Sequence, residues 1–299
     1  MPNNAIKKSL GKRLFDIVNF IIVSFLTVSC VVPLLNILAF SFSSSQAIIE
    51  NRVTLWPVDF TLKAYEFVLS NERFWLSMWV TVKRVLLGVS INVIMIVLVG
   101  YPLSKPDHQF PARKYYVAFM LVVMLFSGGM MPTYFIVAKT GLIDTIWSLV
   151  LPNAVPISSC IILMNFFRGI PRELEESALL DGANQFQIMT QVFLPISKPS
   201  IATVTLFSLI SHWNSWFDGL LYSNHTTNYP MQSYLQTIVV ASASAMEDMD
   251  VETMLAMLEV NETNMQSAQI FISMIPLMMI YPFLQKYFTS GLVMGSVKG

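Results

Sequence analysis

Long apolar runs separated by short polar segments fill most of the chain, and this alternation is its dominant pattern. A helix needs about 20 mostly apolar residues to cross the hydrocarbon core of a bilayer. Six runs are long enough, so the pattern predicts an all-α polytopic membrane protein with six transmembrane helices and both termini on one side. The predicted spans cover about residues 17–42, 85–104, 115–135, 146–167, 201–222 and 268–285.

Two of these runs have features that bear on their structure. The first follows a basic start, as in a secretory signal peptide, but it is too long and no small-residue cleavage site follows it. We therefore expect an uncleaved span. The third is interrupted by Gly128, Gly129 and Pro132, so we expect a helix bend there, with residues 132–139 forming a short helix at the membrane surface.

The composition supports a membrane protein and excludes several other classes. Hydrophobic residues make up 55% of the chain and charged residues 12%, against roughly 25% charged in a typical soluble domain. Lys plus Arg and Asp plus Glu each total 18, so there is no basic excess of the kind that a nucleic-acid binder shows. The two cysteines, Cys30 and Cys160, lie inside apolar runs, which argues against a disulfide framework.

The balanced total charge is unevenly distributed between the two predicted sides. On this topology, 12 of the 18 basic residues share the side of the N-terminus, and 12 of the 18 acidic residues lie opposite. The basic excess marks the N-terminal side as cytoplasmic. The prediction is then a cytoplasmic N-terminus (1–16) and a single six-span domain (17–299). Within that domain we expect a cytoplasmic loop (168–199), an extracytoplasmic loop (223–267) with a short helix near 251–258, and an amphipathic outer stretch at 62–69.

Few ionisable side chains lie in the predicted membrane interior. Asp218 is the only carboxylate within a predicted span and His212 the only histidine. A transporter driven by an ion gradient would be expected to carry more intramembrane carboxylates. The chain also lacks a GxxxxGK[ST] phosphate-binding loop and the HExxH and GxSxG motifs. We therefore expect no catalytic residue, no metal site and no cofactor bound by this chain, and we expect the energy for transport to come from a partner.

The loop at residues 168–199 has the pattern of two short helices. Pro171 suits the start of a helix, and the acidic residues Glu173, Glu175 and Glu176 favour an N-terminal end. Gly182 is a natural stop for this helix. A second amphipathic helix would then carry Phe186, Met189 and Phe193 on one side. The physical pattern alone fits either a simple connection or a surface that docks into a groove of a partner.

A fixed spacing in this loop matches the EAA motif of ABC importer permeases. Three residues separate Glu176-Ser177-Ala178 from Gly182, and nine separate Gly182 from Val192-Phe193-Leu194-Pro195. The family pattern has Glu-Ala-Ala and Ile-x-Leu-Pro there, so Ser177 and Val192 are departures that keep side-chain size. The chain resembles the sugar-importing branch, in particular the subgroup that imports complex oligosaccharides with a lipoprotein receptor. Segment 100–105 ends the second span as in these permeases, and segments 126–134, 141–145 and 213–216, with Gly291 and 295–299, are similar to that subgroup.

This resemblance implies a type I ABC importer permease fold in the cytoplasmic membrane of a bacterium. It implies a second, homologous permease as heterodimer partner, two ATPase subunits that use ATP and Mg²⁺, and an external solute-binding lipoprotein that delivers an oligosaccharide. Closure of the ATPases would push on the loop and switch the pore between inward- and outward-facing states. By the same resemblance, the residues that couple the permease to the ATPases are Glu175, Glu176, Ser177, Ala178, Asp181, Gly182, Ala183, Leu194 and Pro195.

Residues of the substrate pathway are harder to assign. Sugars are bound by aromatic faces and planar hydrogen-bonding groups, which favours Tyr134, Trp213, Asn214, Trp216 and Asp218. The tryptophans fit equally well as anchors at the outer membrane interface. Two other functions also remain open on the sequence: an ABC importer permease for peptides or another small molecule, and a self-sufficient secondary transporter.

Overall fold

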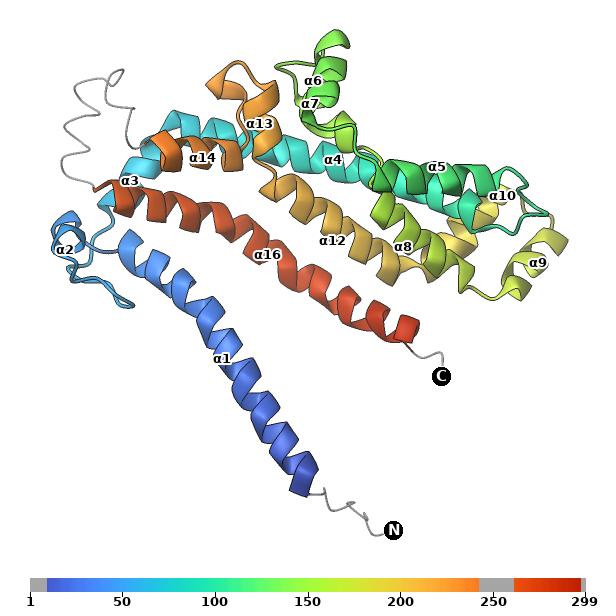
Figure 1. Cartoon of the computed structure of the whole chain (residues 1–299), viewed down its shortest axis with the longest axis horizontal. Coiled ribbons are helices and arrows are strands. Elements are labelled where there is room, and N and C mark those ends of the chain that lie inside the picture. Colours follow the sequence, from blue (N-terminus) through green and yellow to red (C-terminus); the bar gives the residue numbers. More distant parts are fainter. Residues whose placement is uncertain (1–9, 242–260, 297–299) are drawn as a thin grey trace. The chain divides into compact units, whose positions relative to one another are not determined.

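The computed structural model of the protein describes residues 10–241 and 261–296, and all regular secondary structure in these ranges is helical (Figure 1). The all-helical architecture expected from the sequence is therefore confirmed. The described residues contain two single helices long and apolar enough to cross a membrane, or up to five spans if three bent helix pairs each count as one. The chain divides into two compact units: residues up to 70 with 241–272, and 71–240 with the residues from 273 onward.

The first unit contains the longest exposed apolar helix. Helix α1 (Leu10–Ser41) shows its side chains to the surroundings along nearly its whole length, as expected for a helix that lies in lipid or against another chain. Short helices α2 (Ser45–Ile49) and α3 (Lys63–Ser70) follow it. Helix α3 confirms the amphipathic stretch expected at 62–69. The helix expected near 251–258 lies outside the described residues.

A small core holds the first unit together at the C-terminal end of α1. Ala39, Ala47, Ile48 and Val53 are buried against one another. Asn264, in the first turns of α16 (Glu262–Ser296), donates its side-chain amide to the Ser43 carbonyl at 2.6 Å and to the Phe40 carbonyl at 3.3 Å. These bonds satisfy carbonyls at the end of α1 that have no partner within the helix.

The second unit is built around α4 (Glu72–Ser104), which packs against α8 (Ile157–Arg168) and α12 (Lys198–Asn214). Asn71 caps the start of α4, since its side-chain oxygen accepts the amide of Arg73 at 2.9 Å. Pro106 follows the helix end and forces Lys105 into an extended conformation. The shared apolar core contains Ile96, Val97, Tyr101, Cys160, Leu163, Phe167, Ile188, Phe193 and Val204.

The predicted bend in the third apolar run is present. Helix α5 (Arg113–Leu125) and helix α6 (Met130–Lys139) meet at an angle of 113°. Gly129 lies between them with φ of +85°, a conformation that favours glycine. The separate short helix expected at 132–139 is therefore confirmed, with its first residue at Met130.

Breaks that the sequence pattern did not predict divide two further apolar runs. Helix α7 (Ile146–Val150) and a 3₁₀ turn bend by 47° into α8. After α12, residues 215 and 216 interrupt the helix before α13 (Phe217–Tyr222). The outer loop expected at 223–267 also contains a helix, α14 (Met231–Ala241).

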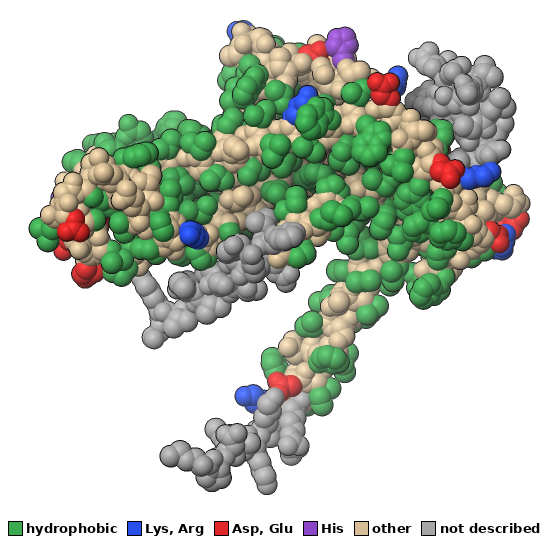
Figure 2. All heavy atoms as spheres, turned by 180° about the vertical axis from the view of Figure 1, so that it is seen from behind, with side chains coloured by type: hydrophobic (Ala, Val, Ile, Leu, Met, Phe, Trp, Pro, Cys, Tyr) green, Lys and Arg blue, Asp and Glu red, His purple; other side chains and the backbone are tan. Residues whose placement is uncertain are grey.

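Hydrophobic side chains cover much of the visible surface, and charged side chains gather toward helix ends (Figure 2). On α1 and α5, large apolar residues such as Phe20, Phe25 and Leu125 are each more than 70% exposed. Exposed apolar surface on this scale would cause aggregation in water. It fits helices whose surroundings are lipid or further protein chains.

Candidate functional site

The cytoplasmic loop predicted from the sequence folds as a helix, a glycine turn and a second helix. Helix α9 (Arg172–Leu180) is followed by Asp181 and then by Gly182, which has φ of +81°. The amide of Gly182 donates to the Leu179 carbonyl, and that of Ala183 to the Ala178 carbonyl, both at 3.0 Å. This pair of bonds is a Schellman motif, which requires a left-handed residue at the position of Gly182. The helix and stop expected from the sequence are confirmed.

The second helix of the loop is fixed at its start by a capping box. The Asn184 side chain accepts the amide of Gln187, and the Gln187 side chain accepts the amide of Asn184, both at 2.9 Å. Helix α10 (Gln185–Gln187) continues as a π-helical turn at Ile188–Phe193 and then α11 (Leu194–Ile196). A bend of 83° leads from this segment into α12.

An ion pair joins the loop to the end of α4. The Lys105 ammonium lies 2.7 Å from Oε1 of Glu175, and the two side chains are 8% and 10% exposed. The same nitrogen lies 4.2 Å and 4.3 Å from the ring centres of Tyr101 and Phe193, within the range of cation–π attraction. Burial lowers the pKa of Lys105, and the adjacent Glu175 opposes that shift. Lys105 therefore contacts α9 and the π-helical turn at once.

A hydrogen bond adds to this connection, since the Tyr101 hydroxyl donates to Oε1 of Gln185 at 2.8 Å. Both helices of the loop are thus held to the last turns of α4. Sequence reasoning missed Lys105, because 70 positions of chain separate it from Glu175 and no local pattern connects them. The available signal was Lys105 directly before the helix-ending Pro106, with Tyr101 one turn earlier.

The residues proposed for coupling occupy two different environments. Glu175 is buried, while Ala178, Ala183 and Leu194 are half-buried and pack on the core. The exposed members are Glu176, Ser177, Asp181, Gly182 and Pro195.

Two apolar side chains of the loop were absent from that set and are prominent on its surface. Leu180 is 90% exposed and Phe186 is 67% exposed. Phe186 does not share the buried side of Met189 and Phe193, contrary to the expected amphipathic pattern, because it precedes the π-helical turn that carries those two residues. Exposed leucine and phenylalanine on a rigid loop form a surface suited to a partner groove.

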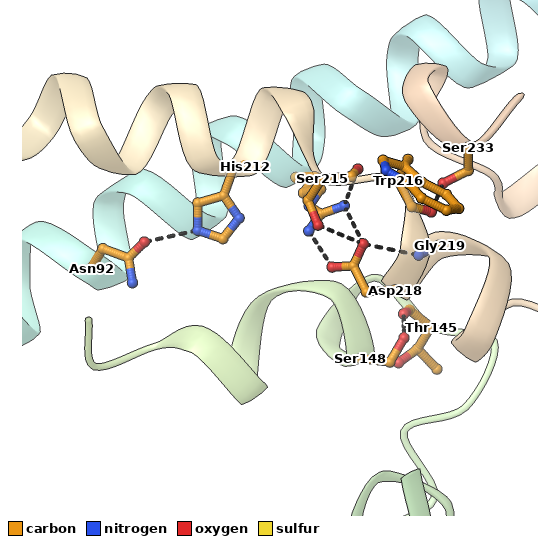
Figure 3. Close-up of polar contacts among 10 residues, drawn as sticks. Asn92, Thr145, Ser148, His212, Ser215, Trp216, Asp218, Gly219 and Ser233 are labelled. Atoms are coloured by element: carbon orange, nitrogen blue, oxygen red, sulfur yellow. Dashed lines mark hydrogen bonds and ion pairs between the residues drawn. The ribbon is translucent and has the colours of Figure 1, made fainter. Parts of the chain in front are cut away.

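The break between α12 and α13 is held by an ionic network around Asp218 (Figure 3). The Arg84 guanidinium contacts both carboxylate oxygens of Asp218, and its Nη1 also donates to the Ser215 carbonyl at 3.1 Å. Oδ1 of Asp218 accepts the Ser215 hydroxyl at 2.8 Å and the Gly219 amide at 2.9 Å. Arg84 is 1% exposed. A broken helix at membrane depth needs such partners for its backbone groups.

The break before α8 is held in the same way by Asn92, two turns further along α4. Its side-chain amide donates to the carbonyls of Asn153 and Ala154 at 2.7 Å and 3.0 Å, and its oxygen lies 2.8 Å from Nε2 of His212 (Figure 3). Gly88 allows the imidazole to reach this position, since a Cβ at Gly88 would lie 2.4 Å from Nε2. One polar side of α4 therefore supports two broken helices.

Sequence reasoning missed Arg84 because the predicted second span began just after it. Helix α4 begins instead at Glu72. The available signal was the helical spacing of Ser77, Thr81, Arg84, Gly88 and Asn92, all of which face the interior.

The candidate substrate residues are divided between surface and core. Trp213 is 4% exposed and packs with Val85 and Leu209, whereas Asn214 and Trp216 are exposed. Asp218 is engaged by Arg84. Tyr134 is half-buried and stacks on Tyr222, with 6.4 Å between the ring centres.

The structure therefore brings Asp218 and Trp216 to one break, with Trp213 and Asn214 at the preceding helix end. Their assignment to a substrate pathway stays a prediction. Within the described residues, no three His, Cys, Asp or Glu side chains lie close enough to hold a metal ion.

The broken apolar helices and the capped helical loop are typical of an all-helical membrane protein. No family model matches the sequence. The chain is nevertheless 36% identical over 290 residues to the polygalacturonan/rhamnogalacturonan transport system permease protein YtcP of Bacillus subtilis, covering 97% of this chain and 100% of the relative. It is 37% identical to protein LplC of the same organism, covering 96% of each. The chain belongs to the carbohydrate-type permeases of ABC transporters.

Solved structures support the same family. A chain of a bacterial ABC transporter involved in the import of the acidic polysaccharide alginate is 32% identical, with a TM-score of 0.86, over 94% of this chain and 99% of that chain. A second chain, from the alginate transporter in complex with an alginate pentasaccharide-bound periplasmic protein, is 18% identical with a TM-score of 0.54, and covers 91% and 92%. The second likeness concerns the fold alone.

Proposed function

We propose that this permease passes an oligosaccharide from an external solute-binding lipoprotein into the cytoplasm, powered by two partner ATPases and paired with a second permease. The observation that carries the proposal is the capped loop with exposed Leu180 and Phe186, in a chain similar over nearly its whole length to carbohydrate permeases. Relatives named for polygalacturonan, rhamnogalacturonan and alginate transport favour an oligosaccharide over a peptide. ATP hydrolysis belongs to the partners, so this subunit is not an enzyme.

The proposed topology has six spans with both termini in the cytoplasm of a bacterium. The three bent helix pairs and α1 and α4 supply up to five spans, and α16, which includes the expected span at 268–285, would be the sixth. The excess of basic residues on the N-terminal side supports this orientation. It places α9, α10 and the residues that we assign to coupling on the cytoplasmic side.

In this proposal, α4 transmits movement from the loop to the two broken helices. Lys105 links one end of α4 to Glu175 of the loop. Arg84 and Asn92, further along the same helix, hold the breaks at Ser215 and at residues 153–154. A push on α9 would therefore move the helix that supports both breaks, which are the irregular segments expected at a transport pathway.

Co-expression with candidate partner genes tests this function. We expect a complex of this chain, a second permease and two ATPases to copurify, with ATPase activity stimulated by sugar-loaded binding protein. The matched control is the same complex carrying Leu180→Asp. A complex that hydrolyses ATP in response to peptide and not to oligosaccharide would instead support a permease for another solute class.

A further inference from the structure

Two adjoining hollows of opposite polarity lie at the end of α4. The first, here called the basic cleft, has a volume of about 500 Å³ and lies between the α4–α5 turn and the α8–α9 corner. Five basic side chains line it: Lys105, His108, Arg113, Arg168 and Arg172. The second, here called the apolar groove, has a volume of about 370 Å³ between α4 and α5. Its lining includes Leu98, Leu103, Phe110, Tyr116 and Phe119.

Leu103 links the groove to two arginines of the cleft. Its side chain lines the apolar groove, and its carbonyl oxygen accepts Nε of Arg113 at 2.9 Å and Nη2 of Arg168 at 3.3 Å, both of which line the basic cleft. Along the α4–α5 turn, cleft residues such as His108 alternate with groove residues such as Phe110. The two hollows therefore lie next to each other at the end of α4, where Leu103 of the groove precedes Ser104 of the cleft.

The charge of the basic cleft is positive after its internal pairs are counted. Asp107 lies 2.8 Å from Nη1 of Arg113, and Glu175 pairs with Lys105. These two acids balance two of the basic side chains. His108, Arg168 and Arg172 remain, and all three are exposed. Two guanidinium groups are well suited to the oxygens of a phosphate group.

We infer that the basic cleft and the apolar groove together bind one anionic phospholipid of the inner leaflet. Its phosphate group would lie at Arg168 and Arg172, and one acyl chain would follow the apolar groove along α4 and α5. A basic pocket beside membrane helices on the cytoplasmic side is a recognised type of anionic-lipid site. The inference rests on the cytoplasmic placement in the proposed function. The groove favours a lipid over free phosphate, which would use the cleft alone.

Native mass spectrometry of the full-length chain in neutral detergent tests the site, with phosphatidylglycerol and phosphatidylcholine added in equal amounts. We expect the chain to retain phosphatidylglycerol preferentially. The double variant Arg168→Gln/Arg172→Gln should lose roughly 10- to 30-fold of that preference, since each surface arginine contributes about three- to fivefold. Leu98→Trp, which fills the groove at a half-exposed position, should lower phosphatidylglycerol retention as well. Arg73→Gln, an exposed arginine at the opposite end of α4, is the control and should change nothing.

Three outcomes would overturn the inference. The first is equal retention of the two lipids. The second is competition by inorganic phosphate that Leu98→Trp does not affect, which would define an anion site alone. The third, measured by copurifying the arginine variant with the partner ATPases, is loss of ATPase association without any loss of lipid, which would assign the cleft to an acidic segment of that partner. Arg168→Lys/Arg172→Lys should keep the lipid preference. That result would show that the loss in the glutamine variant comes from the missing charges and not from a folding defect. Lipid retention needs neither sugar nor ATP, so its failure is distinct from failure of the proposed transport function.

Discussion

Lys105 and Glu175 form a buried ion pair between the end of α4 and α9, the first helix of the loop between α8 and α12, with 2.7 Å between Nζ and Oε1. Removing one partner of a buried pair leaves the other charge uncompensated and costs about 3–5 kcal/mol. We therefore expect Lys105→Met to lower the thermal stability of the chain strongly. Lys105→Met/Glu175→Gln should recover part of the loss, and a double-mutant cycle on the unfolding midpoint measures the coupling between the two residues. Additive effects would show that the pair does not act as a unit.

Leu180 tests the docking surface with little risk to the fold, because its side chain is 90% exposed. We expect Leu180→Asp to leave the unfolding midpoint nearly unchanged and to weaken ATPase association at least tenfold, a loss of about 1.4 kcal/mol or more. Copurification yield and sugar-stimulated ATP hydrolysis are the measurements. Ile49→Asp, at an isoleucine that is 64% exposed on α2 and outside the predicted spans, provides the matched comparison. Equal loss of association in both variants would argue against the docking surface.

Gly88 is the position where α4 approaches the imidazole of His212. A methyl group there would displace the ring and its contact with Asn92, because the added Cβ would lie 2.4 Å from Nε2. Gly88→Ala should destabilise the chain by about 1–3 kcal/mol. Gly100→Ala is the control within the same helix, since its nearest new contact would be an ordinary 3.5 Å. The account of the broken helices fails if the two substitutions have the same effect on thermal unfolding.

How far the sequence predicts this structure depends on the range of the interactions concerned. The length of the apolar runs identified the helices, and Gly182 marked the end of α9. Both signals are local properties of the chain. The breaks at residues 153–156 and 215–216 escaped prediction because their backbone groups are satisfied by Asn92 and Arg84, which are distant in sequence. The sequence pattern does not distinguish the environments of Trp213 and Trp216, yet Trp213 is buried and Trp216 is exposed.

Asp144 gives a test that depends on pH, outside the membrane-spanning helices. Its side chain accepts Nδ2 of Asn228 at 2.9 Å and the amides of Asn224 and His225. These bonds, the Asn228 bond above all, lower the pKa of Asp144 below 3.8. The stabilisation is therefore complete above the unfolded-state pKa and is lost as the pH falls through the folded-state value.

We expect amide exchange at residues 224–228, corrected for its intrinsic pH dependence, to accelerate as the pH falls through the lowered pKa of Asp144. Asp144→Asn should remove most of that dependence. Unchanged protection of this segment in acid would show that the carboxylate does not hold the turn.

Uptake of a radiolabelled oligosaccharide by proteoliposomes measures the proposed transport itself. The vesicles would contain this permease with its partner permease and ATPases, and the sugar-loaded binding protein would be outside. We expect uptake to require ATP inside the vesicles, the side that corresponds to the cytoplasm. We expect it to fall at least tenfold with Leu180→Asp. Uptake by this chain alone, driven by an ion gradient in vesicles without ATP, would contradict the proposed function.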